Sequence, residues 1–401
     1  MKGDAIRQLL FISPVYPFPV KTGQQVRVSK LIEACARGFE VTYLGPGPTD
    51  AEGPEFSTPF KRVLFVEGNG VVSPSALARM LLGGYIGPPG LLRLWRSYLD
   101  AMRSLNLEEF DLIFVERGHL AALAKGHTRK TVVDFDDVEH RKAVREARHV
   151  LTGGARLHAL QRALRLSVRE IVQAFRYRKV FVCSDDDCNY LLRFGLKNVG
   201  IIRNGVDLDG EWAPGEERGR KKALFLGNLD YPPNVDALEY LVHDILPLVH
   251  RRMPDFIVDV IGGGTAPATL RTKRGLNFIG YVPDLRAVLP SYQVMAAPLR
   301  LGGGTKLKLL DAMAAMLPIS TTPVGAEGLE LVDGETALIS ANPKDIADDI
   351  VRLCNDPDYG ASLARGAYAL AAAKFQWVQI QDDLAKVLDS ICAPSGNSQA
   401  S

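Results

Sequence analysis

The segment Pro298–Ala314 (PLRLGGGTKLKLLDAMA) combines residue types that together suit a nucleoside diphosphate. Three glycines precede a helical pattern that we expect to begin near Thr305, whose hydroxyl would cap it. A helix carries partial positive charge at its start, so Lys306 and Lys308 are unfavourable there unless an anion lies beside them. A diphosphate would supply that negative charge, and the free backbone N–H groups would hold it. Asp311 would repel phosphate and is suited to ribose hydroxyls instead.

The predicted diphosphate site draws on two glycine loops and on the start of this helix. Its residues are Gly23, Gly303, Gly304, Thr305, Lys306 and Lys308. Gly23 lies in the loop PVKTGQ after the first predicted strand, and a third glycine loop, Gly262–Gly264, follows another strand. Glycine lets backbone N–H groups approach a phosphate closely, although a tight turn explains any one such loop. The competing interpretation of the helix is a surface Lys308–Asp311 pair, which contributes only about 0.3–0.5 kcal/mol.

Composition and absent signatures narrow the class of protein. Neither G-x-x-x-x-G-K-[ST] nor a G-x-G-x-x-G after the first strand occurs, which argues against P-loop hydrolysis and dinucleotide oxidoreduction. The formal charge is only +2, and no basic–aromatic interleaving appears, so nucleic-acid binding is not expected. The five cysteines are scattered without a C-x-x-C pair, which argues against disulfides and a zinc site. We expect no metal and no cofactor.

The elements that must position these loops alternate between strand and helix patterns in two successive halves, which predicts an α/β protein with mostly parallel sheets. The first half contains the strand candidates 8–12, 38–45, 61–66, 111–116, 130–135, 179–184 and 199–202. The second contains 222–228, 256–262, 276–280, 293–298, 317–321 and 337–340. Two doubly wound, Rossmann-like domains leave a cleft at the carboxyl ends of their strands, where ligands of such sheets bind.

A Gly-, Pro- and charge-rich linker, Arg203–Lys222, separates the halves. We therefore predict an N-terminal domain over residues 1–203 and a C-terminal domain over 204–374. A helix over 375–392 is expected to return toward the first domain, and the small polar tail 393–401 is expected to be disordered.

The sequence favours a cytoplasmic protein that is either free or bound at the inner face of a membrane. The N-terminal apolar run is too short for a signal peptide, and no apolar stretch reaches the length of a spanning helix. Two segments could contact an anionic membrane or a lipid-linked acceptor: Ser75–Leu99 and the basic helix Arg156–Lys179. The alternatives are core packing for the apolar residues and a solvated face for the arginines.

Several motifs in this order resemble glycosyltransferase family 4, which has the GT-B fold of two facing Rossmann-like domains. The motifs are IIRNGVD (201–207), LGNLDYPPNVDAL (226–238), GYVPDL (280–285), GGGTKLKLLDAMA (302–314) and TPVGAEGLELVDG (322–334). The resemblance implies transfer of a sugar, of the hexosyltransferase type, from a nucleotide sugar to a glycan, lipid-linked or small-molecule acceptor. It also implies retention at the anomeric carbon, no metal, and a role in polysaccharide biosynthesis. It places the base of the nucleotide on Tyr281, Val282 and Asp284.

The sequence departs from the family pattern at two places. Members often carry two glutamates with seven residues between them; the second falls on Asp311 and the first on Gly303, which has no side chain. Glu327 is therefore our candidate for the donor sugar. The segment matching the family's catalytic histidine, VVDFDDVEHRK (132–142), offers Asp136 and Asp137 first, and these carboxylates could stabilise an oxocarbenium-like centre or take a proton. Capping of the next helix is their alternative role, and His119 is the alternative catalytic candidate.

Two other functions remain open from the sequence. A nucleotide-sugar epimerase of similar fold would release nucleotide without an acceptor. A non-catalytic nucleotide-sugar-binding protein would bind nucleotide without turnover, and the missing carboxylate at Gly303 favours it.

Overall fold

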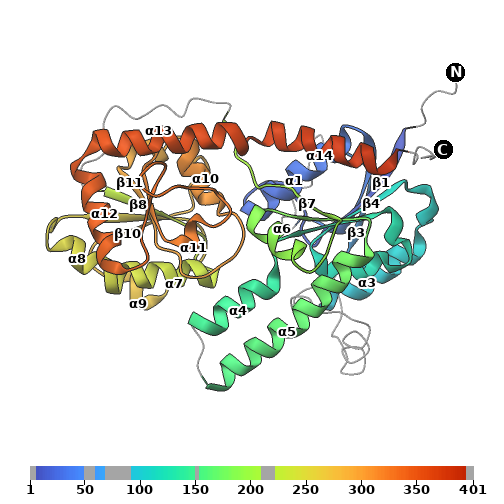
Figure 1. Ribbon diagram of the computed structural model, residues 1–401, viewed down its shortest axis with the longest axis horizontal. Helices are drawn as coiled ribbons and strands as arrows, with labels where there is room; N and C mark the ends of the chain where they lie inside the picture. The colour runs from blue at the N-terminus through green and yellow to red at the C-terminus, as the bar shows by residue number, and fades with distance from the viewer. Residues whose placement is uncertain (1–5, 49–58, 68–91, 150–152, 209–221, 394–401) are drawn as a thin grey trace.

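The computed structural model describes residues 6–48, 59–67, 92–149, 153–208 and 222–393, and it contains two α/β domains that lie side by side (Figure 1). The predicted disordered tail after Ala393 and most of the stretch Ser75–Leu99 lie outside the described residues. None of the helices in the described part is both long enough and apolar enough to cross a membrane.

The first domain is built on a parallel sheet with the strand order β3-β2-β1-β4-β5-β6-β7 among the described residues. Every residue of β4 and β5 is buried, because helices cover both faces, and this explains why the central strands read as continuous apolar runs. The strands are β1 Arg7–Ile12, β2 Phe39–Pro46, β3 Phe60–Val66, β4 Leu112–Glu116, β5 Thr131–Asp136, β6 Lys179–Val182 and β7 Val199–Ile201.

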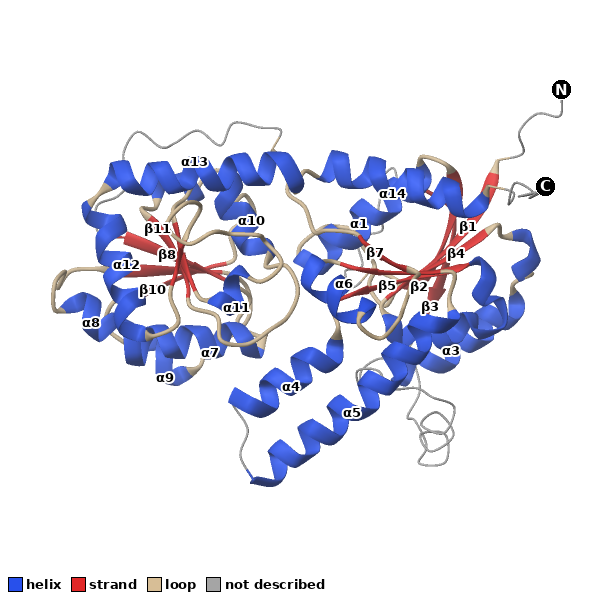
Figure 2. Cartoon of the chain, viewed as in Figure 1, coloured by secondary structure: helices blue, strands red, loops and turns tan. Residues whose placement is uncertain are grey.

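The helices of this domain include one pair that does not lie on the sheet. Helices α4 and α5 form a hairpin that projects beyond the two sheets (Figure 2). The helices are α1 Gly23–Ala36, α3 Leu92–Ser104, α4 Glu139–His149, α5 Gly153–Arg176 and α6 Asp185–Leu192, with the 3-10 segments η2 Leu107–Glu109 and η3 Gly118–Lys130.

The second domain repeats the same plan with the strand order β10-β9-β8-β11-β12-β13 among the described residues. Its strands are β8 Lys222–Leu226, β9 Ile257–Ile261, β10 Leu276–Gly280, β11 Val294–Ala297, β12 Ile319–Thr321 and β13 Leu338–Ile339. Its helical segments are α7 Pro232–Tyr240, η4 Leu241–Ile245, α8 Leu246–His250, α9 Ala268–Arg271, η5 Leu289–Ser291, α10 Leu307–Ala314, α11 Pro323–Ala326, α12 Pro343–Asn355 and α13 Pro357–Lys374. In each sheet the strand order reverses next to the first strand of the domain, between β1 and β4 and between β8 and β11. Ligands of doubly wound sheets bind at this point.

Helix α14 (Trp377–Cys392) belongs by sequence to the end of the chain but packs on the first domain (Figure 1). Trp377, Ile380 and Leu384 join the core formed by β1, β2 and α1. The Gln381 side chain also donates hydrogen bonds to the Lys30 carbonyl and to Glu33. The chain therefore passes between the domains twice, and the two passages pair through the Val206 N–H and the Phe375 carbonyl at 2.7 Å.

Candidate functional site

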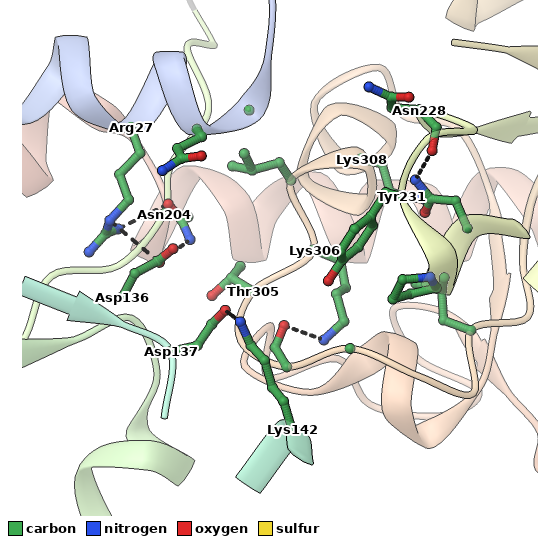
Figure 3. Close-up of a pocket in the computed structure, with 18 of the residues that line it drawn as sticks. Arg27, Asp136, Asp137, Lys142, Asn204, Asn228, Tyr231, Thr305, Lys306 and Lys308 are labelled. Carbon is green, nitrogen blue, oxygen red and sulfur yellow. Dashed lines mark hydrogen bonds and ion pairs between the residues drawn. The ribbon is translucent and has the colours of Figure 1, made fainter. Parts of the chain in front are cut away.

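A cavity of about 460 Å³ lies between the two domains and is lined by residues of both (Figure 3). Seven of the residues predicted from the sequence line it: Gly23, Asp136, Asp137, Gly303, Thr305, Lys306 and Lys308. They come from the start of α1, the end of β5, the loop before α10 and the first turn of α10. The folding of both sheets thus brings together glycines, carboxylates and lysines that are up to 285 residues apart, from Gly23 to Lys308.

The N-cap of helix α10 lies one residue later than predicted. The first residue of the helix is Leu307, Lys306 occupies the N-cap position, and no side chain caps the helix. The Thr305 hydroxyl instead donates a hydrogen bond of 3.4 Å to the Cys183 carbonyl of the first domain. The prediction that Thr305 caps the helix was wrong because this contact between domains takes its hydroxyl. The start of α10 is consequently open toward the cavity.

The two lysines at the start of α10 form no ion pair with any carboxylate among the described residues. Lys308 Nζ donates to Asn234 Oδ1 at 2.6 Å, and Lys306 Nζ donates to the Gly303 and Gly304 carbonyls at 3.2 and 2.5 Å. Burial, with the neighbouring Lys306, lowers the pKa of Lys308 to about 7, and burial also lowers the pKa of Lys306. The charges of Glu327 and Asp137 act on Lys306 without forming an ion pair with it, and an anionic ligand at the positive end of the helix would give both lysines a direct partner.

Asp311 lies further along α10 and does not line the 460 Å³ cavity. Burial raises the pKa of its carboxyl to about 7, and the charge of Arg286 opposes this only in part. The predicted base-binding residues are also outside the cavity: Tyr281 and Asp284 are exposed, and Val282 packs against the core of the second domain. Their segment begins at Gly280, which lines a second cavity of about 520 Å³ along β9 and β10.

Asp136 and Asp137 follow β5 and face the lysine helix across the cavity (Figure 3). Asp136 Oδ2 pairs with Arg117 Nη2 at 2.8 Å, and Asp137 pairs with Lys142 of α4. Although burial raises it, the charges of Lys142 and Arg117 hold the pKa of Asp137 below its usual value. An ionised Asp137 can accept hydrogen bonds from a sugar hydroxyl or stabilise positive charge, but it cannot donate a proton.

The glycines of the α10 loop allow the first domain to approach closely. A Cβ at Gly304, whose φ is 56°, would lie 1.5 Å from Asp137 Oδ1. A Cβ at Gly303 would lie 2.7 Å from Lys142 Cγ. The space that side chains at these two positions would need is therefore filled by the Asp137–Lys142 pair of the other domain.

Glu327 does not line the cavity, and its carboxylate is engaged by the first domain. Arg145 of α4 donates from Nη1 and Nη2 to its two oxygens at 2.8 and 2.9 Å, and Arg141 lies 3.6 Å away. Arg145 Nη1 also donates to the Gly302 carbonyl. The carboxylate predicted to bind the donor sugar thus links the two domains in this structure.

His119 also lies outside the cavity lining. Burial, together with the charges of Arg117 and Arg169, lowers its pKa to about 3, so the imidazole is neutral and a weak base. The other histidine of this region, His140, is buried between Glu170 and Tyr190, with Nδ1 2.5 Å from Glu170 Oε2 and Nε2 2.8 Å from the Tyr190 hydroxyl. Neither geometry favours a histidine base at this cavity.

The ligand atoms of Asp136, Asp137 and Cys183 lie within 4.8 Å of one another. A metal ion there would compete with Arg117 and Lys142, which already pair with the two carboxylates. Burial also raises the pKa of the Cys183 thiol well above its usual value, whereas a metal ligand must be the thiolate. These groups suit a metal poorly.

Sequence reasoning missed the buried arginine that organises the first-domain wall of the cavity. Arg27 of α1 donates from Nε and Nη2 to the two Asp134 oxygens at 2.9 Å each, and from Nη1 to Asn204 Oδ1 at 2.9 Å. Its Nε also lies 3.4 Å from Asp136 Oδ1. The available signal was a lone arginine among the apolar residues of α1, opposite a strand that contains Asp134.

Arg27→Leu is expected to lower the free energy of unfolding by about 3–5 kcal/mol, because it leaves the Asp134 carboxylate buried without a partner. Urea denaturation of the two proteins measures this difference. Arg37→Leu is the matched control: Arg37 follows α1 and pairs with Asp382 at the surface, where a pair contributes less than about 1 kcal/mol. Equal losses in the two variants would contradict the assigned role of Arg27.

The chain matches two family models. The model described as Glycosyltransferase Family 4 matches residues 22–209, and the model described as Glycosyl transferases group 1 matches residues 220–356.

Two curated proteins illustrate the extent of the sequence similarity. The chain is 27% identical over 227 residues to the glycogen synthase of Mycobacterium tuberculosis, and the match covers 51% of each chain. The chain thus spans about half the length of the first curated relatives that it matches. It is 26% identical over 400 residues to the phosphatidyl-myo-inositol mannosyltransferase of Mycobacterium leprae, covering 95% of this chain and 96% of that one.

Solved structures share the two-domain arrangement. Sucrose-phosphate synthase from Thermosynechococcus elongatus matches with a TM-score of 0.72 at 17% identity, covering 96% of this chain and 99% of that one. HepE from Anabaena, solved in complex with UDP-glucose, matches with a TM-score of 0.65 at 14% identity, covering 96% and 99%. Similarity at these identities shows a common fold.

Proposed function

Because the chain belongs to glycosyltransferase family 4 and has the GT-B fold, we propose that it transfers a sugar, a hexose, from a nucleoside-diphosphate sugar to an acceptor hydroxyl with retention at the anomeric carbon. The proposed acceptor is a glycan, a lipid-linked molecule or a small molecule. The mannosyltransferase of Mycobacterium leprae, whose name includes a phosphatidylinositol, supports the lipid-linked class.

The observation that carries this proposal is the pair of lysines without carboxylate partners at the open start of α10. The diphosphate of the donor lies there, held by the N–H groups of the glycine loop and neutralised by Lys306 and Lys308. Asp311 accepts hydrogen bonds from the ribose, and the segment from Gly280 to Asp284 holds the base. The complex of HepE with UDP-glucose supports this class of donor.

The first domain supplies the carboxylate that Gly303 lacks. Asp137 enters the α10 loop where the two glycines leave space, and Lys142 keeps it ionised. It accepts hydrogen bonds from the donor sugar and stabilises the positive charge that develops at the anomeric carbon. The bond from this carbon to the diphosphate oxygen breaks as the bond to the acceptor oxygen forms, and the acceptor proton passes to the departing diphosphate.

A thermal-shift screen with UDP, GDP, ADP and their sugars tests the donor site first. A selective rise in the unfolding temperature with one nucleotide, followed by acceptor-dependent release of that nucleotide from its sugar, is the expected result. A protein that responds to none of these nucleotides would refute the proposal.

One observation favours a second function, that of a nucleotide-sugar-binding protein without turnover. Gly303 has no side chain, and the carboxylate of Glu327 is occupied by Arg145. Selective stabilisation by one nucleotide sugar without turnover for any acceptor, including lipid-linked ones, would decide for this alternative.

The affinity for the nucleotide sugar is expected to fall as pH rises above about 7. In the protein without ligand, the pKa of Lys308 is about 7. A bound diphosphate raises this pKa, so above pH 7 the binding of the nucleotide sugar is accompanied by the uptake of a proton. The dissociation constant of the nucleotide sugar should increase by up to about tenfold per pH unit between pH 7 and the pKa of the complex. Titration calorimetry from pH 6 to 9 measures this, and Lys308→Arg, which stays charged, should flatten the dependence. A constant affinity in the native protein would contradict the assignment.

A further inference from the structure

Helix α5 has two apolar faces, of which only one is covered. Ala159, Ala163 and Leu166 are buried, and Ala163 and Leu166 pack with Ala143 of α4. The opposite face carries a row of exposed apolar side chains that we call the α5 stripe, made up of Leu157, Leu160, Leu164, Val168, Val172 and Phe175. The buried face thus holds α5 against α4, whereas the α5 stripe contributes nothing to the packing of the hairpin.

The α5 stripe is continuous and strongly exposed. Leu157, Leu164, Val168 and Phe175 are 59%, 67%, 58% and 58% exposed. Leu157 and Phe175 are 18 residues apart, which is about five helical turns, so the stripe runs straight for about 27 Å. Other exposed apolar residues, such as Val332 and Val378, do not form such a row on one helix. Contiguous apolar surface on this scale marks an interaction site.

The charges beside the stripe have one sign. Arg156, Arg162, Arg165 and Arg176 of α5 are all exposed. Glu170, which is the one acidic residue between Gly153 and Arg176, is buried and accepts hydrogen bonds from the backbone N–H groups of Glu139 and His140. The exposed side of α5 therefore presents apolar side chains flanked by arginines, without an acidic group of its own.

The position of the hairpin leaves this side accessible to a flat surface. Helix α4 and the first part of α5 extend away from both sheets (Figure 2), whereas Ala174 near the end of α5 joins the core of the first domain. The buried face of α5 points to α4, so the stripe points away from it.

We propose that the α5 stripe binds the surface of an anionic lipid bilayer, with α5 lying in the plane of the interface. The apolar side chains enter the boundary between headgroups and acyl chains, and the arginines pair with lipid phosphates. Charge complementarity favours the bilayer, because the arginines beside the stripe face negative lipid phosphates. A second copy of the same face would instead place arginines against arginines. The proposal does not depend on the transfer reaction, because the stripe and the cavity are formed by different residues.

Flotation of the full chain with vesicles of phosphatidylcholine, with or without about 30% phosphatidylglycerol, tests the proposal. We expect binding to the anionic vesicles that weakens as salt increases, and little binding to the neutral ones. Leu164→Gln/Val168→Gln/Phe175→Gln should lower the binding at least tenfold. Arg156→Gln/Arg162→Gln/Arg165→Gln should weaken binding to anionic vesicles and remove its dependence on salt.

Val332→Gln/Val378→Gln is the matched control, since it removes exposed apolar side chains elsewhere and should leave vesicle binding unchanged. The unfolding temperature of each variant shows whether it is folded, and substitutions at these exposed positions are expected to leave it nearly constant. Equal binding to neutral and anionic vesicles, or native-like binding by the Leu164/Val168/Phe175 variant, would overturn the proposal. A second result would also overturn it: the native protein binds no vesicles but forms a concentration-dependent dimer, and the Leu164/Val168/Phe175 variant does not dimerise. A second copy of the chain would then be the partner that covers the α5 stripe.

Discussion

Asp137→Asn is expected to lower the turnover number of sugar transfer by about 10²- to 10⁴-fold while changing the affinity for the free nucleotide only a few-fold. The substitution keeps the size of the side chain but removes the negative charge that Asp137 brings into the α10 loop beside Gly304. That charge acts on the anomeric centre as it becomes positive, so its loss affects the transition state more than the bound nucleotide. Initial rates with saturating donor, together with nucleotide titration, measure the two effects.

Asp186→Asn is the matched control, because this carboxylate is exposed in the first turn of α6 and away from the cavity. It should leave both the turnover number and the affinity unchanged. Asp136→Asn separates the neighbouring carboxylates, since Asp136 pairs with Arg117 and Asp137 with Lys142, and only Asp137 lies against Gly304. A turnover number that survives Asp137→Asn and is lost in Asp136→Asn would move the proposed role to Asp136.

Lys306→Met/Lys308→Met is expected to raise the dissociation constant of the nucleotide sugar by about 10²- to 10⁴-fold, because each lysine contributes a charged hydrogen bond of about 1.5–3 kcal/mol. The unliganded variant should be at least as stable as the native protein, because burial of the two ammonium groups lowers their pKa values and therefore costs stability at neutral pH. Calorimetric titration and thermal unfolding give the two quantities.

The control for this variant is Lys273→Met/Lys344→Met, which removes two exposed lysines from the same domain. It should leave the dissociation constant within about twofold, which separates local contact from a general effect of charge. Native-like nucleotide affinity in the Lys306/Lys308 variant would remove the basis of the donor-site assignment.

The glycine loop before α10 and the carboxylates after β5 could be predicted from the sequence because both depend on local rules. Each lies at the end of a short apolar run that favours a buried strand, and carboxyl ends of parallel strands meet at one edge. The resemblance of the motifs to the family then predicted that the two domains face each other. Five of the seven predicted residues that line the cavity belong to these two places, and the other two are Gly23 at the start of α1 and Lys308 in the first turn of α10.

The contacts between the domains could not be predicted, because they join residues that no local pattern relates. Glu327 and Arg145 are 182 positions apart. Arg145 belongs to a segment rich in arginine and lysine, and nothing in the sequence distinguishes it from its basic neighbours as the partner of Glu327. The Thr305 hydroxyl donates a hydrogen bond to the Cys183 carbonyl of the other domain and does not cap α10. Helix-capping preferences do not predict such a contact between domains. The same limit applies to Asp137: its entry into the α10 loop depends on how two separately folded sheets meet.

The packing of α14 has a consequence for how the protein is made. The residues that close one side of the first core, Trp377, Ile380, Leu384 and Leu388, are 9% exposed or less and lie at the far end of the chain. Domains generally fold as units while the ribosome synthesises them from the N-terminus. The first domain therefore keeps an open apolar surface until α14 has emerged, which happens only after the second domain has been synthesised.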